Sequence, residues 1–383
     1  MSDLAIASII SATILLASTV SIELGISAAI IEMSLGVLVG NVFGIHPTAW
    51  LTFIASFGGI LLTFLAGTEV DVKVMRENLK ESILIGGISF IAPFALAFAF
   101  AYFGAHWSLN ASKITGIALS TTSLAVVYAV LVESGLTNTK LGKIIMASTF
   151  VTDLLTVTAL SIVFFQVNIY TLVFYIFSLL LLVFSPKLIK YFFKRYNGKV
   201  IEPEIKLLFF VFFISMFLAQ IGDAHAELPI FILGLLLSTI YAQNPHLLKK
   251  FRTVGFALIT PFFFIKGGMN VGISDVLANS GLLVLFLLVK LGAKVVSVYP
   301  VTRWQLPSGG RVFLTLLMST GLTFGTISSV FGFQSGYIDK AQFSILITTV
   351  ILSAIVPTII AQRFFAPLPA EEKELLLEEG EEG

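Results

Sequence analysis

Long uninterrupted apolar runs are the feature that most constrains the fold of this chain. About 20 consecutive apolar residues are enough to cross a bilayer as an α-helix, and such runs recur along the whole sequence of 383 residues. Hydrophobic residues make up 57% of the chain and charged residues only 12%, a composition too apolar for a water-soluble domain. The sequence therefore predicts an all-α polytopic membrane protein.

Thirteen membrane crossings are predicted, and together they form one transmembrane domain over residues 1–365, followed by a short acidic tail over 366–383. Two of the crossings are short and contain Pro229 and Pro261, which membrane helices tolerate when neighbouring helices satisfy the freed backbone groups. The predicted crossings lie near residues 4–21, 26–44, 52–70, 82–104, 114–132, 141–165, 169–193, 205–222, 228–243, 253–270, 276–299, 311–334 and 341–365.

The distribution of lysine and arginine predicts the orientation, because these residues collect in cytoplasmic loops. Of the 23 basic residues, 16 fall in loops after odd-numbered crossings and only two in loops after even-numbered crossings. A wrong number of crossings would destroy this bias. We therefore expect a multi-pass protein of the plasma membrane with its N-terminus outside and its C-terminus in the cytoplasm.

Two crossings are interrupted by small and hydroxyl-bearing residues at matching places. Residues 118–123 of the fifth crossing read Ala-Leu-Ser-Thr-Thr-Ser, and residues 319–326 of the twelfth read Ser-Thr-Gly-Leu-Thr-Phe-Gly-Thr. The two crossings are seven apart, so they run in opposite directions. This pattern is typical of inverted-topology repeats, in which two broken helices meet near the middle of the membrane and line the substrate site. The alternative is that these hydroxyls only bond to the preceding turn of their own helices.

Asp153 lies about halfway along the sixth crossing, directly after Thr152. A carboxylate at membrane depth is costly and usually belongs to an ion or proton path. Burial favours its protonated form and a bound cation favours its ionised form, so such a group can exchange a proton for a metal ion. We expect Thr152, together with Thr121, Thr122 and Ser123 of the broken crossing, to add neutral oxygen ligands for an alkali cation. The alternative is an aspartate held in a structural pair with a lysine.

Two lysines lie one turn apart on one face of the eleventh crossing and are predicted charge partners of the acidic site. Lys290 is near the centre of the membrane, whereas Lys294 is closer to the cytoplasm and is expected to reach the interface by extending its side chain. Ser319 and Thr320 of the second broken crossing are predicted helpers. Glu69, at the end of the third crossing, is either a helper or a structural residue at a helix terminus.

Other chemistry finds no support in the sequence. The chain has no cysteine, which excludes disulfides and thiolate metal sites. Its four histidines lack metal-ligand spacing, and neither a phosphate-binding loop nor a nucleophile elbow is present. We therefore expect neither enzymatic activity nor a cofactor, and no nucleic-acid partner.

Several short motifs, taken in order, identify a family resemblance. They are residues 31–32 with Gly36 and Gly40, residues 64–71, residues 118–123, Thr152-Asp153, residues 261–264 with 267–269, and Lys290 followed by the broken twelfth crossing. With these motifs, residues 24–365 resemble the monovalent cation:proton antiporter-2 (CPA2) family, which includes sodium/proton antiporters and the membrane part of Kef-type potassium efflux systems.

The resemblance implies a fold and a mechanism. It implies a homodimer with a scaffold over residues 4–70 and 169–270, and a moving core over residues 82–165 and 276–365. In such a protein Asp153 carries either the cation or the proton while the core alternates between inward-facing and outward-facing states. Kef-type relatives also carry a nucleotide-binding regulatory domain, which we do not expect in this chain.

One departure from the family pattern bears on stoichiometry. Electrogenic relatives tend to have two acidic residues, or Asn-Asp, where this chain has Thr152-Asp153, and Kef-like relatives have Gln-Asp. With one carboxylate, a one-for-one electroneutral exchange is the simpler prediction. If Lys290 also loses its proton during the cycle, two protons could move for each cation.

The residues thus favour a secondary transporter that exchanges Na⁺ or K⁺ for protons. Two alternatives stay open at this point. One is a sodium-coupled symporter for an organic anion on a related inverted-repeat fold. The other is a channel-like or sensory subunit, in which the broken helices form a conduction or signalling element.

Overall fold

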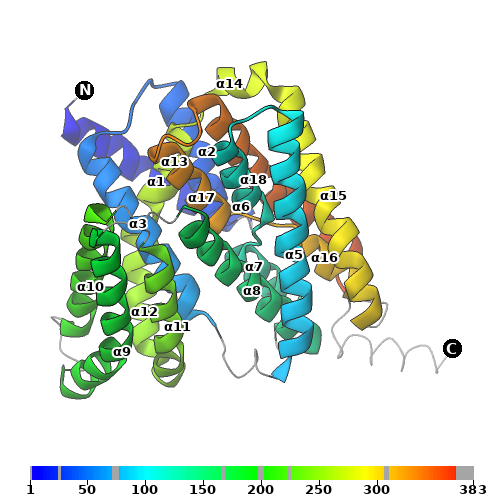
Figure 1. The fold of residues 1–383 in the computed structure, drawn as a ribbon. Helices are drawn as coiled ribbons and strands as arrows, with labels where there is room; N and C mark the ends of the chain where they lie inside the picture. The colour runs from blue at the N-terminus through cyan, green and yellow to red at the C-terminus, as the bar shows by residue number, and fades with distance from the viewer. Residues whose placement is uncertain are drawn as a thin grey trace. The chain divides into compact units, whose positions relative to one another are not determined.

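The structure, a computed structural model, is helical throughout the residues that it describes (Figure 1). These are residues 2–24, 27–70, 77–137, 139–164, 169–196, 202–222, 224, 226–305 and 310–367. Asp71 of the family motif and nearly all of the predicted acidic tail lie outside the described residues.

The helices follow one another along the chain with short connections. They are α1 (Asp3–Leu24), α2 (Ala28–Asn41), α3 (Ala49–Thr68), α5 (Leu79–Ala99) with the π-helical turn η1 (Phe100–Gly104), α6 (Leu109–Ser120), α7 (Leu124–Glu133), α8 (Lys140–Val163), α9 (Ile169–Tyr196), α10 (Pro203–Ile221), α11 (Glu227–Gln243), α12 (Pro245–Val254) with the π-helical turn η2 (Gly255–Ile259), α13 (Thr260–Met269), α14 (Ile273–Ala278), α15 (Ser280–Gln305), α16 (Arg311–Met318), α17 (Thr323–Gln334) and α18 (Lys340–Ile360) with the π-helical turn η4 (Ala361–Phe365).

These elements account for all thirteen predicted crossings. Within the described residues, nine helical segments are long and apolar enough to span a membrane, counting α16 and α17 as one, and α2 and α11 are shorter apolar helices. The other two crossings are the broken pair α6 and α7 and the segment α12–η2–α13. The prediction of an all-α polytopic membrane protein is confirmed.

The tenth crossing begins earlier than predicted. Its helix starts at Pro245 rather than near residue 253 and passes through η2 just before Pro261. The first turns, α12, carry Lys249, Lys250 and Arg252, so an apolar window does not detect them. Proline lacks a backbone N–H and disrupts the helical ladder four residues upstream, and a π-helical turn absorbs that irregularity.

The chain divides into two compact units, each built from two separate stretches of sequence. The first unit comprises residues 1–72 and 157–273, and the second comprises residues 73–156 and 274–383. In each unit, elements far apart in the sequence pack together.

In the first unit, α2 and α13 pack backbone against backbone through glycine. A Cβ atom added to Gly40 would lie 2.8 Å from the Cα of Met269, and one added to Gly268 would lie 2.8 Å from the N atom of Val37. No side chain fits there, so small residues let the two helices approach, as in other membrane proteins. The same unit holds an aromatic cluster in which Phe64 packs against Phe212 and Phe251, with ring centroids 4.9 and 5.3 Å away.

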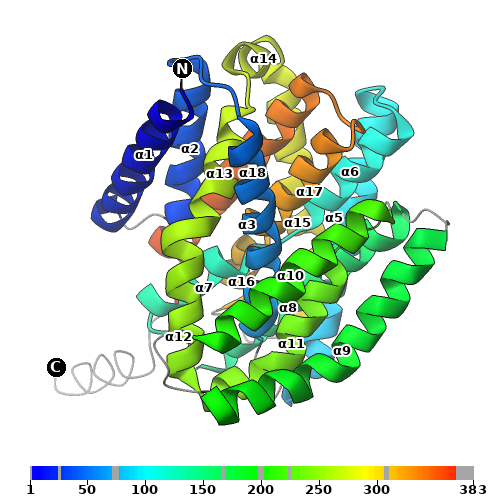
Figure 2. The same ribbon diagram turned by 90° about the vertical axis from the view of Figure 1, so that its left-hand side faces the viewer.

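In the second unit, α17 lies along α6, as the two views of the ribbon show (Figures 1 and 2). A Cβ atom on Gly325 would lie 3.0 Å from the carbonyl oxygen of Ala118, and one on Gly332 would lie 2.7 Å from the side chain of Ile114. The residue numbers rise on one helix as they fall on the other. The two broken segments therefore run antiparallel, as the sequence predicted.

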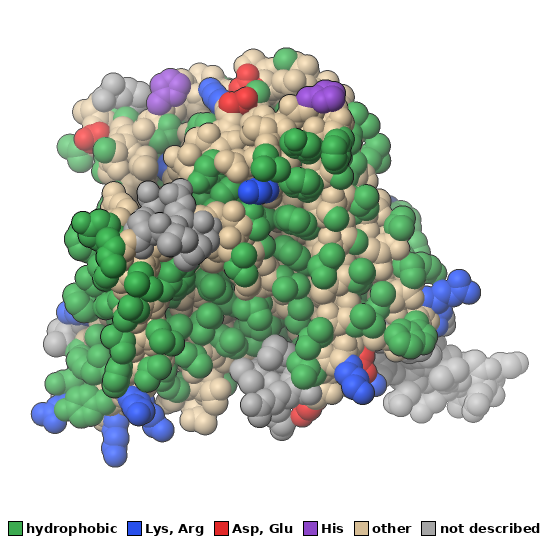
Figure 3. Space-filling model, in the orientation of Figure 1, with side chains coloured by type: hydrophobic (Ala, Val, Ile, Leu, Met, Phe, Trp, Pro, Cys, Tyr) green, Lys and Arg blue, Asp and Glu red, His purple; other side chains and the backbone are tan. Residues whose placement is uncertain are grey.

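The surface of α9 in the first unit has the character of a lipid-facing helix. Leu172, Leu179 and Val183 are exposed on it, and Lys194 and Arg195 occupy its last turn. In Figure 3 hydrophobic side chains cover the visible face of α9 and α10, and basic side chains gather at one end of that face. An apolar flank with a basic end suits a helix that crosses a bilayer.

Candidate functional site

The two interrupted helices meet at their breaks, inside the second unit. One break separates α6 from α7 at residues 121–123, and the other separates α16 from α17 at residues 319–322. The backbone N–H of Ser123 donates to the carbonyl oxygen of Thr320 over 3.1 Å. The hydroxyl of Thr122 donates to the carbonyl oxygen of Met318 over 2.9 Å. Each break thus satisfies backbone groups that the other would leave unpaired.

Asp153 lies on α8 in the same unit and is only 1% exposed, so protein rather than lipid surrounds it. Its carboxylate interacts electrostatically with the side chain of Lys294 on α15. The hydroxyl of the preceding residue, Thr152, is fully buried and donates to the carbonyl oxygen of Thr149 over 2.6 Å. Because the hydrogen of that hydroxyl is engaged, its oxygen still has lone pairs to offer to a cation.

Lys294 is fully buried, and its ammonium group has three acceptors. It donates to the hydroxyl of Ser89 over 2.9 Å, to the carbonyl oxygen of Ser120 over 2.7 Å and to the hydroxyl of Thr122 over 3.2 Å. The expectation that Lys294 extends to the membrane interface is wrong. Its amine is held inside the protein because the end of α6 and its neighbour α5 supply polar partners there.

Lys290, one turn away on α15, is equally buried but has a different environment. Its amine nitrogen has no hydrogen-bond partner among the described residues. The amine lies directly over Gly321 in the second break, where an added Cβ atom would collide with it and would approach the carbonyl oxygen of Thr121 to 2.9 Å. The structure therefore brings Lys290, Gly321 and Thr121 together.

The hydroxyl-bearing residues of the breaks divide into two groups. Thr121, Ser319 and Thr320 donate to carbonyl oxygens three or four residues earlier in the chain, at 3.4, 2.8 and 2.7 Å, which is the local role considered as the alternative. The hydroxyls of Thr122 and Ser123 instead reach the helix ends that flank the other break, at the carbonyl oxygen of Met318 and, over 3.5 Å, at the hydroxyl of Thr323. All five predicted break residues are buried.

Glu69 lies in the first unit and forms an ion pair there. Its carboxylate accepts from the guanidinium of Arg252 on α12 over 3.0 Å. Both side chains are partly exposed, at 24% and 39%. The structure therefore gives Glu69 a pairing role at the end of α3, within a different unit from Asp153.

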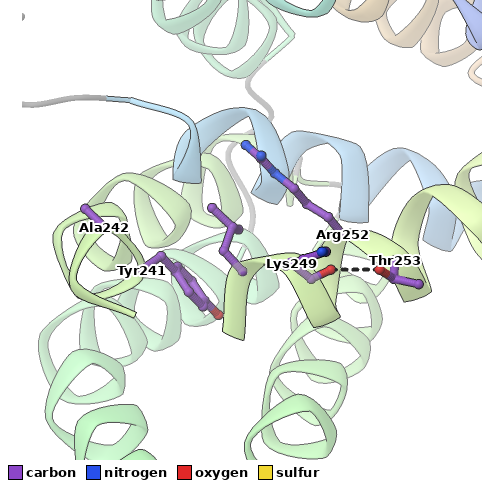
Figure 4. A pocket seen from close by; sticks show the side chains of 6 residues that line it. Tyr241, Ala242, Lys249, Arg252 and Thr253 are labelled. Atoms are coloured by element: carbon purple, nitrogen blue, oxygen red, sulfur yellow. Dashed lines mark hydrogen bonds between the residues drawn. The ribbon is translucent and has the colours of Figure 1, made fainter. Parts of the chain in front are cut away.

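Arg252 also lines an open hollow of about 590 Å³ on the first unit (Figure 4). Tyr241, Ala242, Leu248, Lys249 and Thr253 line it with Arg252. In Figure 4 the arginine side chain points away from Thr253, whose hydroxyl donates to the carbonyl oxygen of Lys249 over 2.9 Å. The hollow belongs to α11 and α12 and contains no member of the acidic site.

Two residues of the site escaped the sequence reasoning. Ser89 lies on an apolar crossing with nothing nearby in the sequence to mark it, and Gly321 was read only as part of the break. Within the described residues, no three acidic or histidine side chains are grouped to hold a metal ion.

Comparison with known proteins decides the family, because residues 9–366 match the family described as sodium/hydrogen exchanger, transmembrane. The chain belongs to the sodium/hydrogen exchanger family. It is 26% identical over 353 residues to the probable Na(+)/H(+) antiporter 3 of Methanocaldococcus jannaschii, covering 87% of this chain and 89% of that protein. It is 25% identical over 369 residues to the Na(+)/H(+) antiporter of Enterococcus hirae, covering 91% and 94% of the two chains.

A solved structure shares the fold. The sodium proton antiporter MjNhaP1 from Methanocaldococcus jannaschii superposes with a TM-score of 0.71 over 94% of this chain and 97% of its own, at 14% sequence identity. This exchanger is thus a multi-pass membrane protein of the sodium/proton antiporter fold, from a family of transporters that exchange cations for protons. The predicted family relationship is confirmed at that level, and the assignment to the CPA2 branch stays a prediction.

Proposed function

We propose that this exchanger moves Na⁺ or K⁺ against protons across the plasma membrane by alternating access, with the carboxylate of Asp153 binding the cation and the proton in turn. The observation that carries the proposal is a carboxylate only 1% exposed within the unit that contains both interrupted helices. A carboxylate buried to this degree is costly to keep ionised unless a positive partner accompanies it.

Competition at one carboxylate explains the coupling. The ionised form of Asp153 attracts a cation, whereas its protonated form has no charge to offer, so the two ligands exclude each other. Neutral oxygens of Thr152 and of residues 121–123 complete the cation shell in this proposal, with Ser319 and Thr320 as helpers. A shell with one charged ligand binds an alkali ion weakly enough to release it again.

The movement that exposes the site to each side is assigned to a core that comprises most of the second unit and, from the first unit, residues 157–165. In this proposal residues 82–165 and 276–365 form the moving core, and residues 4–70 and 169–270 form the scaffold of a homodimer. Two sets of contacts support a core that stays intact while it moves. Lys294 makes three hydrogen bonds, and a backbone hydrogen bond from Ser123 to Thr320 joins the two breaks. The bias of Lys and Arg supports an outside N-terminus and a cytoplasmic C-terminus.

Reconstitution into proteoliposomes tests the proposal. Dissipation of an imposed pH gradient is followed on adding Na⁺, K⁺ or Li⁺, with the membrane potential clamped and unclamped. Asp153→Asn is expected to abolish the cation-dependent change while the protein still folds. Asp275→Asn, an acidic residue of the same unit on the short helix α14, is the matched control and should keep exchange. Wild-type exchange in the Asp153 variant would refute the shared carboxylate.

A further inference from the structure

The open hollow between α11 and α12 on the first unit has a positively charged lining (Figure 4). Of the six described side chains that line it, two are basic, Lys249 and Arg252, and none is acidic. Its volume of about 590 Å³ lies within the range of pockets that hold small molecules, about 300–1,000 Å³. The hollow is therefore large enough for a polar group of several heavy atoms, and its charge favours an anion.

Lys249 carries a positive charge that no carboxylate of the described residues pairs with. The next residue, Lys250, differs from it because its amine pairs with Glu202. The side chain of Lys249 is exposed and lines the hollow. An ammonium group has three hydrogens to donate, so Lys249 has donors available for an anion that enters the hollow.

The guanidinium of Arg252 keeps most of its donors after pairing with Glu69. It has five N–H donors in a planar fork that fits the oxygens of a phosphate group. Among the described residues its one hydrogen-bond acceptor is Glu69, 3.0 Å from Nη2, and 39% of the side chain is exposed. Arg252 lies three residues after Lys249, so the two are neighbours on the surface of α12. Together they can bind one phosphate group.

The position of α12 along its crossing places the hollow near lipid headgroups. The helix carries Lys249, Lys250 and Arg252 and continues through η2 into the apolar helix α13. Basic residues at the end of a membrane span lie at the interface with water. In the orientation proposed above, this end faces the cytoplasm, and the cytoplasmic leaflet contains the anionic lipids.

The exposed face of α12 changes from polar to apolar within two turns. Lys249, Thr253 and Phe256 occupy positions i, i+4 and i+7, which share one face of a helix, and all three are exposed. Phe256 is 44% exposed, and Leu258 of the same π-helical turn is 61% exposed. An anion bound beside Lys249 therefore has apolar surface directly beyond it. This combination suits a phosphate that carries acyl chains better than a free phosphate ion.

We propose that the hollow binds the headgroup of an anionic phospholipid, with Lys249 and Arg252 as ligands of its phosphate and with its acyl chains along Phe256 and Leu258. Arg252 binds the phosphate and Glu69 together, since its fork has donors for both. The lipid site belongs to the first unit, whereas Asp153 belongs to the second. The inference goes beyond the proposed function and takes from it only the orientation of α12.

Lipid titration of the purified protein in a neutral detergent tests the site. Native mass spectrometry gives the Kd of phosphatidylglycerol, which is anionic, and of phosphatidylcholine with the same acyl chains, which is zwitterionic. The variants are Lys249→Gln, Arg252→Gln and the double variant. Each lost charge is expected to weaken binding of phosphatidylglycerol about five-fold and to leave phosphatidylcholine unaffected. Equal Kd values for phosphatidylglycerol in the wild type and the double variant would overturn the proposal.

The matched control removes a lysine and an arginine from another helix. Lys194→Gln with Arg195→Gln acts on exposed residues in the last turn of α9, and neither residue lines the hollow. This double variant should keep the wild-type affinity for phosphatidylglycerol. A loss as large as that of the variant lacking Lys249 and Arg252 would show that the lipid responds to net charge alone, which would overturn a defined site.

Glu69→Gln separates a phosphate ligand from a structural role of Arg252. This variant removes the carboxylate that shares the guanidinium, so it should bind phosphatidylglycerol at least as tightly as the wild type. If Arg252 acted only through its pair with Glu69, Glu69→Gln would weaken binding as much as Arg252→Gln does. That result would overturn the role of Arg252 as a ligand.

The deacylated headgroup, glycerophosphoglycerol, separates a lipid from a soluble phosphate compound. It has the same phosphodiester but no acyl chains to bury, so it is expected to bind at least about ten-fold more weakly than phosphatidylglycerol. Equal affinities would overturn the lipid and assign the hollow to a soluble phosphate compound. All of these readouts are binding constants, so they hold whether or not the antiport proposed above is correct.

Discussion

Replacing Gly321 by alanine tests whether the second break is built around the amine of Lys290. The added Cβ atom would lie 2.9 Å from the carbonyl oxygen of Thr121 and 3.0 Å from its hydroxyl, and closer still to the amine of Lys290. The lysine is flexible and can withdraw. The carbonyl of Thr121 is backbone and can withdraw only if the first break moves with it.

The size of the effect follows from these contacts. Forcing one methyl group into a packed interior costs about 1–3 kcal/mol, which lowers the population of the native arrangement about 5-fold to 150-fold. Gly321 lies in an unwound segment, so alanine brings no compensating gain in helix propensity. We therefore expect lower thermal stability in detergent and a loss of exchange that exceeds any loss of folded protein.

Gly292→Ala is the matched control for this substitution. Gly292 lies on α15 between the two lysines, and a Cβ atom there would meet nothing within 4 Å. Alanine in a helix interior is favoured over glycine by about 0.5–1 kcal/mol, so this variant should be as stable as the wild type or slightly more so. If Gly321→Ala matched Gly292→Ala in both melting temperature and exchange rate, the steric argument would be wrong.

Three further predictions concern the first unit. Gly268→Ala should lower thermal stability by forcing α2 away from α13, because its Cβ atom would lie 2.8 Å from the N atom of Val37. The control is Gly281→Ala on α15, where a Cβ atom would meet nothing within 4 Å and the melting temperature should not fall. Equal melting temperatures of the two variants would contradict this prediction. A double-mutant cycle of Glu69→Gln and Arg252→Gln, measured on the free energy of unfolding, should give a coupling below about 1 kcal/mol, since the pair is partly exposed. A larger coupling, or loss of exchange in either variant, would assign the pair to the transport machinery. The hydrogen bond from Lys250 lowers the pKa of Glu202 below its ordinary value of 4.5. The pair therefore stabilises the fold above that value, and the stabilisation is lost as the pH falls through the lowered pKa. Lys250→Met should remove this loss from the plot of melting temperature against pH, and an unchanged plot would count against the pairing.

Much of the fold was predictable from the sequence because the membrane limits the choices. Apolar length predicted the crossings, and the matching hydroxyl-rich segments predicted two breaks that the structure brings together. The start of α12 was missed because Lys249, Lys250 and Arg252 interrupt its apolar character. That helix is stabilised by packing of Leu247 and Phe251, which an apolar window does not weigh.

The site was less accessible to sequence reasoning, because its contacts join distant residues. Asp153 and the two lysines stood out as charges at membrane depth. The different surroundings of Lys290 and Lys294 depend on Ser89, Ser120 and Gly321, none of which carries a charge to attract attention. Glu69 and Arg252 are 183 residues apart, and no pattern along the chain could have paired them.

The reciprocal bonding of the two breaks bears on the alternating access proposed for this exchanger. If either interrupted crossing straightened alone, the N–H of Ser123 or the carbonyl oxygen of Thr320 would lose its partner inside the protein, where an unpaired backbone group is costly. Rearrangement within the crossing is therefore penalised, while displacement of the whole crossing breaks none of its internal bonds. In the alternating-access cycle proposed above, this bonding would favour moving the two breaks together as one unit over separating them in every turnover.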